Sequence, residues 1–145
     1  MTIEEARYET ANDLAKLMVE LWPECNLIEE QTNCHRILQV KNETCFLAIE
    51  ETRYIGFVHL ALRSEYVEGT DTSPVGYVEG IYVTPDYRNA GIGKQLIRAG
   101  EVWIKEMGCT QLASDTSIDN ISSIEFHKQL GFKEVARIAC FIKEV

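Results

Sequence analysis

The chain has 145 residues, of which 46% are hydrophobic and 26% are charged, and its formal net charge is −9 at pH 7. This length and composition exclude a disordered chain and predict one globular domain over residues 1–145. No apolar run approaches the roughly 20 residues of a membrane-spanning helix, and the acidic start differs from a signal peptide, so we expect a cytoplasmic protein. The negative charge argues against partners such as nucleic acid or a membrane, and it suits either a cationic substrate or simple solubility.

The cysteines indicate a reduced protein without a metal centre. They are odd in number, widely spaced and lack a Cys-x-x-Cys pair, which fits neither a disulfide framework nor a zinc site. The five residues are Cys25, Cys34, Cys45, Cys109 and Cys140. We therefore expect free and mostly buried thiols and no metal.

The N-terminal half of the sequence predicts two helices flanked by strands. Thr10 is placed to cap the first helix, with Asp13 as the partner acid of a capping box. That helix ends at Trp22, because the residue before Pro23 avoids the helical conformation. Runs of β-branched and aromatic residues predict the strands. The expected elements are a strand at 3–8, helices at 10–22 and 27–40, and strands at 44–50, 54–66 and 75–83.

The C-terminal half alternates helices and strands. Leu96, Ile97 and Val102 give an apolar stripe to a helix at 91–107, which Gly108 ends. The elements expected after it are a strand at 110–113, a helix at 119–130 and a final strand at 132–142. The order strand, two helices, three strands, helix, strand, helix, strand predicts a layered α/β fold (α+β layered) with a mixed sheet.

A glycine-rich segment lies between the strand at 75–83 and the helix at 91–107. It reads Arg88-Asn89-Ala90-Gly91-Ile92-Gly93-Lys94. Glycine lets the backbone approach a ligand closely, and free N–H groups at a helix start attract an anion. The spacing fits neither a Walker P-loop nor the dinucleotide-binding fingerprint. Taken alone, the segment is explained by a phosphate cradle or by an ordinary glycine-rich turn.

A second group of residues follows at a defined spacing, and it consists of Asn120, Ser123, His127, Gly131 and Phe132. Together with the Arg-x-x-Gly-x-Gly segment, this group resembles the GNAT superfamily of acetyltransferases. The resemblance implies the GNAT fold, in which a mixed, mostly antiparallel central sheet carries helices on both faces, and it implies acetyl-CoA as cosubstrate. The chain departs from the family pattern at Ser123, where alanine is typical, and at His127, where a tyrosine often acts as general acid.

Longer blocks are similar to aminoglycoside 6'-N-acetyltransferases. They comprise residues 21–23, 64–75, 78–83 and 109–115. The similarity runs through most of the chain and is densest from Tyr66 to Phe132. It implies a homodimeric enzyme that transfers an acetyl group directly from acetyl-CoA to the 6'-amine of a cationic aminoglycoside antibiotic, which gives antibiotic resistance.

The same resemblance implies roles for individual residues. Glu79 would bind the substrate ammonium group and act as the catalytic base, and Trp22, Tyr66 and Asp115 would also contact the substrate. Ala136 stands where the family often has a carboxylate that touches the substrate. The implied cofactor-binding residues are Ile81, Tyr82, Val83, Asn89, Ala90, Gly91, Ile92, Gly93, Lys94 and Asn120.

These residues also have structural explanations. Glu79 can lie on a solvent-exposed face of its strand, Asp115 can stabilise a turn, and Asn120 can start a helix. Trp22 and Tyr66 can be packing residues. Two other functions fit the pattern as well: an N-acetyltransferase for another amine, such as a polyamine or a protein lysine, and a non-catalytic acetyl-CoA sensor.

Overall fold

A five-stranded sheet forms the centre of the computed structural model, which describes residues 1–145. The strands follow one another across the sheet in the order β1-β2-β3-β4-β5. Neighbouring strands are antiparallel from β1 to β4, whereas β5 is parallel to β4. The strands are β1 (Thr2–Glu5), β2 (Glu43–Glu50), β3 (Arg53–Arg63), β4 (Val75–Val83) and β5 (Leu112–Ala113).

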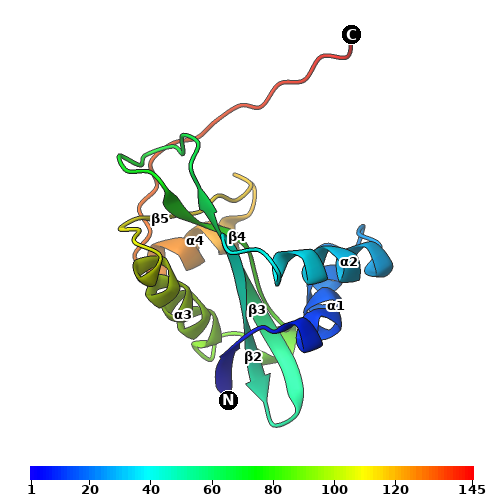
Figure 1. Cartoon of the computed structure of the whole chain (residues 1–145). Coiled ribbons are helices and arrows are strands. Elements are labelled where there is room, and N and C mark those ends of the chain that lie inside the picture. Colours follow the sequence, from blue (N-terminus) through cyan, green and yellow to red (C-terminus); the bar gives the residue numbers. More distant parts are fainter.

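Helices cover both faces of this sheet (Figure 1). The first two helices pack on one face, where Leu14, Met18 and Phe57 belong to one buried cluster. The third helix packs on the other face, where Leu60 and Leu96 belong to a second cluster. The helices are α1 (Ala11–Leu21), α2 (Leu27–Ile37), α3 (Ile92–Glu106) and α4 (Ile121–Gln129), with short 3-10 turns at Tyr8–Thr10 and Pro85–Tyr87.

This architecture confirms the predicted fold class, a mixed and mostly antiparallel sheet with helices on both faces. The bounds of β4 agree with the prediction, and most other elements are shorter than expected by a few residues. None of the helices combines the length and the apolar character needed to cross a bilayer.

The predicted final strand at 132–142 is wrong. Residues 132–145 form neither helix nor strand, and Figure 1 shows this tail leaving the body of the protein. Phe141 and Ile142 are each 94% exposed. The sequence has the β-branched and aromatic residues of a strand, but a strand also needs a hydrogen-bonding neighbour, and the tail pairs with no strand of the sheet.

The predicted capping box at the start of α1 is also wrong. The Thr10 hydroxyl accepts a hydrogen bond from the Arg7 N–H and donates one to the Arg7 carbonyl, each at 2.9 Å. These bonds close the 3-10 turn that precedes α1, and no side chain caps the helix itself. Thr10 therefore stabilises the turn, because its hydroxyl meets the nearer backbone groups of Arg7 first.

Candidate active site

Glu79 lies at an irregularity in the pairing of β3 with β4. His59 pairs with Gly80 and Leu60 pairs with Val78, so Glu79 is the additional residue of a β-bulge. A bulge redirects side chains and strengthens the local twist of a strand. Val78 belongs to the buried cluster on one face, and strand alternation points its neighbour Glu79 to the other face. The Glu79 side chain is 25% exposed, which is neither a core position nor a free surface position.

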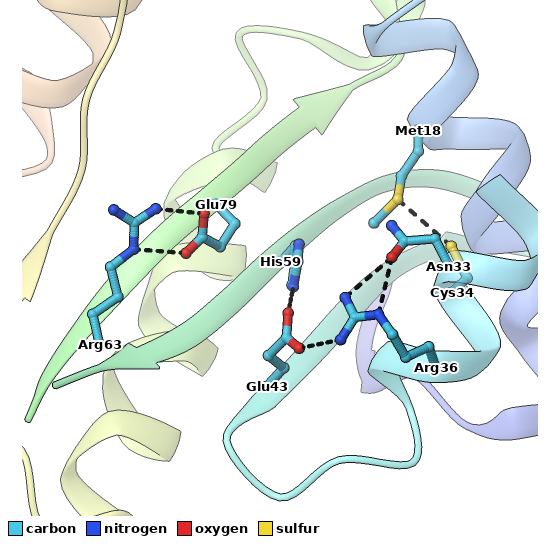
Figure 2. A network of polar contacts seen from close by, with 8 residues as sticks. All are labelled: Met18, Asn33, Cys34, Arg36, Glu43, His59, Arg63 and Glu79. Atoms are coloured by element: carbon cyan, nitrogen blue, oxygen red, sulfur yellow. Dashed lines mark hydrogen bonds and ion pairs between the residues drawn. The ribbon is translucent and has the colours of Figure 1, made fainter. Parts of the chain in front are cut away.

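Both carboxylate oxygens of Glu79 accept hydrogen bonds from Arg63, the last residue of β3 (Figure 2). Arg63 Nε lies 2.9 Å from Glu79 Oε1, and Arg63 Nη2 lies 2.8 Å from Glu79 Oε2. Such a bidentate pair is stronger and more directional than a single charged hydrogen bond. Hydrogen bonding to Glu79 is the main reason why the pKa of Arg63 is raised, although burial acts in the opposite direction.

A tyrosine joins this ion pair to Asp115. Arg63 Cζ lies 3.4 Å from the centroid of the Tyr77 ring, which is a close cation–π contact. The Tyr77 hydroxyl donates a hydrogen bond to Asp115. Burial, and after it the bond to Asp115, raise the pKa of the Tyr77 hydroxyl, so Tyr77 stays a hydrogen-bond donor at neutral pH. The structure thus brings two predicted site acids, Glu79 and Asp115, into one network.

The two predicted aromatic contacts lie in different surroundings. Trp22 directly follows α1, and its indole lies over Gly80 beside the bulge. A Cβ atom on Gly80 would lie 2.7 Å from Trp22 Cη2, so this approach requires glycine. Tyr66 lies in the loop after β3 and is 77% exposed. The structure therefore brings Trp22 to the strand of Glu79 and leaves Tyr66 on the surface of the adjacent loop.

The edge of β4 that faces β5 becomes unpaired just before Glu79. β4 and β5 pair only at Gly76 with Leu112 and at Tyr77 with Ala113, whereas β4 continues to Val83. Backbone groups of Ile81 to Val83 that point away from β3 therefore lie on an unpaired edge. One of the acceptors has a partner, because Arg88 Nε donates to the Val83 carbonyl at 2.7 Å.

The glycine-rich segment has the conformation expected of an anion site. Asn89 has φ 62° and Gly91 has φ 79°, so both lie in the left-handed region. The N–H groups of residues 89–94 donate to no backbone or side-chain acceptor of the chain, and they lie at the start of α3. Consecutive free N–H groups at a helix N-terminus favour binding of a phosphate group.

Two of the predicted cofactor residues also have structural roles. A Cβ atom on Gly93 would lie 2.7 Å from Phe126 Cζ, so Gly93 lets α3 and α4 pack closely. Asn120 Oδ1 accepts from the Ser123 N–H at 3.1 Å and so caps α4. The structural explanation of Asn120 as a helix-start residue is therefore confirmed, and its amide NH2 donates no hydrogen bond within the chain.

His127 is held between two serines. The Ser123 carbonyl can only accept, so His127 Nδ1, at 2.7 Å from it, carries the hydrogen. His127 Nε2 forms a hydrogen bond with the Ser114 hydroxyl at 2.8 Å. Both ring nitrogens of His127 therefore have partners within the chain, and the ring is held between α4 and Ser114.

Sequence reasoning did not find Arg63 and Tyr77. Tyr77 precedes Glu79 by two residues, so strand alternation places both on one face, and this signal was available. Arg63 comes from a different strand. It meets Glu79 because of the register of β3 with β4, including the bulge, and no local pattern predicts that register.

Comparison with known proteins identifies the family. Residues 7–132 match the Acetyltransferase (GNAT) family. The chain belongs to this family. It is 38% identical over 145 residues to the aminoglycoside N(6')-acetyltransferase type 1 of Acinetobacter haemolyticus. The aligned region covers all of this chain and 99% of that protein. It is 39% identical over 127 residues to the enzyme of the same name from Salmonella typhimurium, over 88% of each chain.

Solved structures give the same result. The apo aminoglycoside 6'-N-acetyltransferase of Acinetobacter haemolyticus superimposes with a TM-score of 0.93 at 37% identity, over 100% of this chain and 99% of that one. AAC(6')-Iy in complex with the bisubstrate analog CoA-S-monomethyl-acetylneamine gives a TM-score of 0.95 at 35% identity, over 99% and 98% of the two chains. The resemblance to these acetyltransferases that the sequence predicted is confirmed.

Proposed function

We propose that this chain is an aminoglycoside 6'-N-acetyltransferase that uses acetyl-CoA and confers antibiotic resistance. The main support is the combination of an acidic network around Glu79, an open strand edge that continues from Glu79, and a segment of free amides at the start of α3. Relatives named aminoglycoside N(6')-acetyltransferase are 33% to 43% identical to it. Acetylation would remove a positive charge from the drug and weaken its binding to phosphates of RNA.

The cofactor side of the proposed site uses mainly backbone. The free N–H groups of residues 89–94 would bind the pyrophosphate of acetyl-CoA, with the left-handed Gly91 shaping the segment. The open edge of β4 from Ile81 to Val83 would bind the pantetheine arm. An N–H group near the thioester oxygen would stabilise the negative charge that develops there. The unused amide of Asn120 is a further donor for the cofactor.

The substrate side uses side chains. Glu79 would bind the 6'-ammonium group and accept its proton through a water molecule. The amine nitrogen then attacks the thioester carbon, the carbon–sulfur bond breaks, and coenzyme A leaves and takes up a proton. Asp115, Trp22 and Tyr66 would hold the drug so that its amine and the thioester are aligned, which is the main source of rate. No cysteine belongs to this site, so the proposal is direct transfer.

We also infer that the enzyme is a homodimer of the cytoplasm. The tail exposes five large apolar side chains, Val135, Ile138, Phe141, Ile142 and Val145. An extended segment with unpaired backbone groups can pair with a strand of a second copy. All five cysteines are free, which suits a reducing compartment. Light scattering should give twice the mass of the chain, and Phe141→Asp with Ile142→Asp should lower it, whereas a monomeric wild type would contradict the dimer.

Release of coenzyme A thiol tests the proposed activity. The assay compares a kanamycin-type drug that has a free 6'-amine with a matched drug that lacks it, together with a polyamine and a lysine peptide. We expect release only with the drug that has the 6'-amine. A higher kcat/KM on the polyamine or the peptide would favour an acetyltransferase for another amine. Binding of acetyl-CoA without turnover on any amine would favour a sensor.

A further inference from the structure

An internal cation occupies the carboxylate to which the substrate ammonium group is proposed to bind. The Arg63 guanidinium donates a hydrogen bond to each carboxylate oxygen of Glu79, with N···O distances of 2.8 and 2.9 Å (Figure 2). We propose that Arg63 is a resident counter-cation, which neutralises Glu79 in the absence of substrate and is displaced from it by an ammonium group of the drug. This inference rests on the proposed function, because it needs Glu79 to bind a cationic substrate.

The surroundings explain why the free enzyme needs such a cation. Glu79 is largely withdrawn from water, and a carboxylate in that position is costly unless it is paired. Asp115 adds a second negative charge nearby, and its charge also favours the protonated form of Arg63 by raising its pKa. The guanidinium lies on the ring of Tyr77, which bonds to Asp115, so one cation serves both acids.

The surroundings also allow Arg63 to leave. Its side chain is 41% exposed and lies at the end of β3, directly before a loop. It borders a surface hollow of about 300 Å³ that is also lined by Ser64 and Glu65. Glu65 offers the released guanidinium another carboxylate. Water and salt reach the guanidinium and screen the ion pair, so a substrate with several ammonium groups can replace it.

Binding the Arg63 guanidinium and a drug ammonium group to Glu79 at the same time is electrostatically unfavourable. A carboxylate has additional lone pairs, but an ammonium group bonded beside the bidentate guanidinium would place two positive charges within a few ångströms of each other. Release of Arg63 removes this repulsion. It also leaves the carboxylate with the drug, where the proposed base is needed.

A second arginine–glutamate pair in this protein has more hydrogen-bond partners than the pair of Arg63 with Glu79. Arg36 Nη1 lies 2.8 Å from Glu43 Oε2, and His59 Nε2 lies 2.9 Å from the other oxygen. Asn33 accepts two further hydrogen bonds from Arg36, at 3.1 and 3.3 Å. Figure 2 shows this network beside the simpler pair of Arg63 with Glu79. Arg63 has no such additional side-chain acceptor, and Arg36 therefore provides a matched control.

The test compares Arg63→Met with Arg36→Met, since each removes one positive charge and keeps an apolar stem. Calorimetry measures the Kd of a kanamycin-type drug and of acetyl-CoA. Displacement predicts that Arg63→Met tightens drug binding about two- to fivefold, which is the range of an exposed ion pair. Acetyl-CoA binding should not change, and Arg36→Met should leave the Kd of the drug near the wild-type value. Without drug, Arg63→Met should melt at a lower temperature, and the drug should raise its Tm by more than in the wild type.

An unchanged or weaker Kd in Arg63→Met would overturn the proposal, because Arg63 would then share Glu79 with the drug or contact the drug itself. Arg63→Lys keeps the charge without the bidentate geometry and decides the question if the Met variant does not fold. It should bind the drug more tightly than the wild type, and equal or weaker binding would overturn the displacement. Drug binding by the wild type without acetyl transfer would overturn the proposed function alone, whereas the absence of drug binding would overturn both.

Discussion

In the proposed site, the cofactor side and the substrate side are built from different parts of the polypeptide. The cofactor side uses backbone N–H groups of residues 89–94, which are contiguous in the sequence. The substrate side uses the side chains of Arg63, Tyr77, Glu79 and Asp115, which come from β3, from β4 and from the residues after β5. A backbone site depends on local conformation, and a side-chain site depends on register. Substitutions should therefore impair one side and spare the other.

Glu79→Gln should give the largest effect, and it should be confined to the substrate side. The variant keeps the shape of the side chain but loses its charge and its basicity. We expect kcat/KM for the drug to fall about 100-fold or more, which is the range of a general base. Steady-state thiol release across pH 6 to 9 measures this, and calorimetry should show unchanged acetyl-CoA binding. Activity within threefold of wild type would contradict both proposed roles of Glu79.

Glu43→Gln is the matched control for this prediction. It removes the same charge from the second arginine–glutamate pair, which contains none of the residues assigned to either side of the site. We expect its kcat/KM for the drug to stay close to wild type. A loss as large as that of Glu79→Gln would mean that total charge, and not the position of Glu79, governs the rate.

Gly91→Val should impair the cofactor side. A non-glycine residue in the left-handed region costs about 1 to 2 kcal/mol, so we expect acetyl-CoA binding to weaken about tenfold if the segment leaves its binding conformation. Drug binding should not change. Gly108→Val is the control, because Gly108 has φ 84° and, like Gly91, nothing within 4 Å of an added Cβ. Both variants should lose similar stability, and equal loss of acetyl-CoA affinity in both would contradict a specific role for Gly91.

Asp115→Asn should have a smaller effect on the substrate side. Asn can still accept from Tyr77, so the network persists while the charge is lost. We expect the KM of the drug to rise about three- to fivefold, as for an exposed charge pair, with little change in the KM of acetyl-CoA. Because salt shortens the Debye length to about 8 Å at physiological ionic strength, potassium chloride should raise the KM of the drug more than that of acetyl-CoA. If neither potassium chloride nor Asp115→Asn changes the KM of the drug, the acidic surface has no role in substrate binding.

The Arg36–Glu43 pair, which contains no residue of the proposed site, should affect stability and not activity. Burial raises the pKa of Glu43, but hydrogen bonds from Arg36 and His59 outweigh it and lower the pKa overall. Burial lowers the pKa of His59. Both folded pKa values lie below the ordinary values of 4.5 and 6.5, so the associated stability is present above those values and is lost as the pH falls. Glu43→Gln should cost about 1 to 3 kcal/mol at pH 7 and less at pH 4, whereas a difference in Tm that is constant with pH would contradict this linkage.

The two sides also differ in how far the sequence predicts them. The conformation of the cofactor segment follows from local physics, because glycine at a helix start allows the left-handed conformation and the first N–H groups of a helix have no acceptor. Its assignment to acetyl-CoA came from the family resemblance. Glu79 and Asp115 were predicted through family resemblance, and the sequence places them 36 residues apart without indicating that Tyr77 and Arg63 link them. That link depends on the bulge that makes Glu79 the additional residue of β4.

The tail shows the same limit in the fold. Val135, Ile138 and Ile142 have the side chains of a strand, and they predicted one at 132–142. Strand formation depends on a neighbouring strand as well as on the segment itself. β5, the strand before the tail in the sequence, pairs with β4 over only two residues. Properties of a segment are therefore readable from the sequence, whereas pairings between segments, such as β3 with β4 or the tail with a second copy, are not.

Mapping the acetylated nitrogen tests the central proposal most directly. The purified enzyme is incubated with acetyl-CoA and a kanamycin-type drug that carries several amines, and the product is analysed by mass spectrometry and NMR. The proposed function predicts a single acetyl group on the 6'-nitrogen, with product formation greatly reduced in Glu79→Gln. Acetylation at another nitrogen, or no acetylated drug under conditions in which the enzyme binds acetyl-CoA, would contradict it.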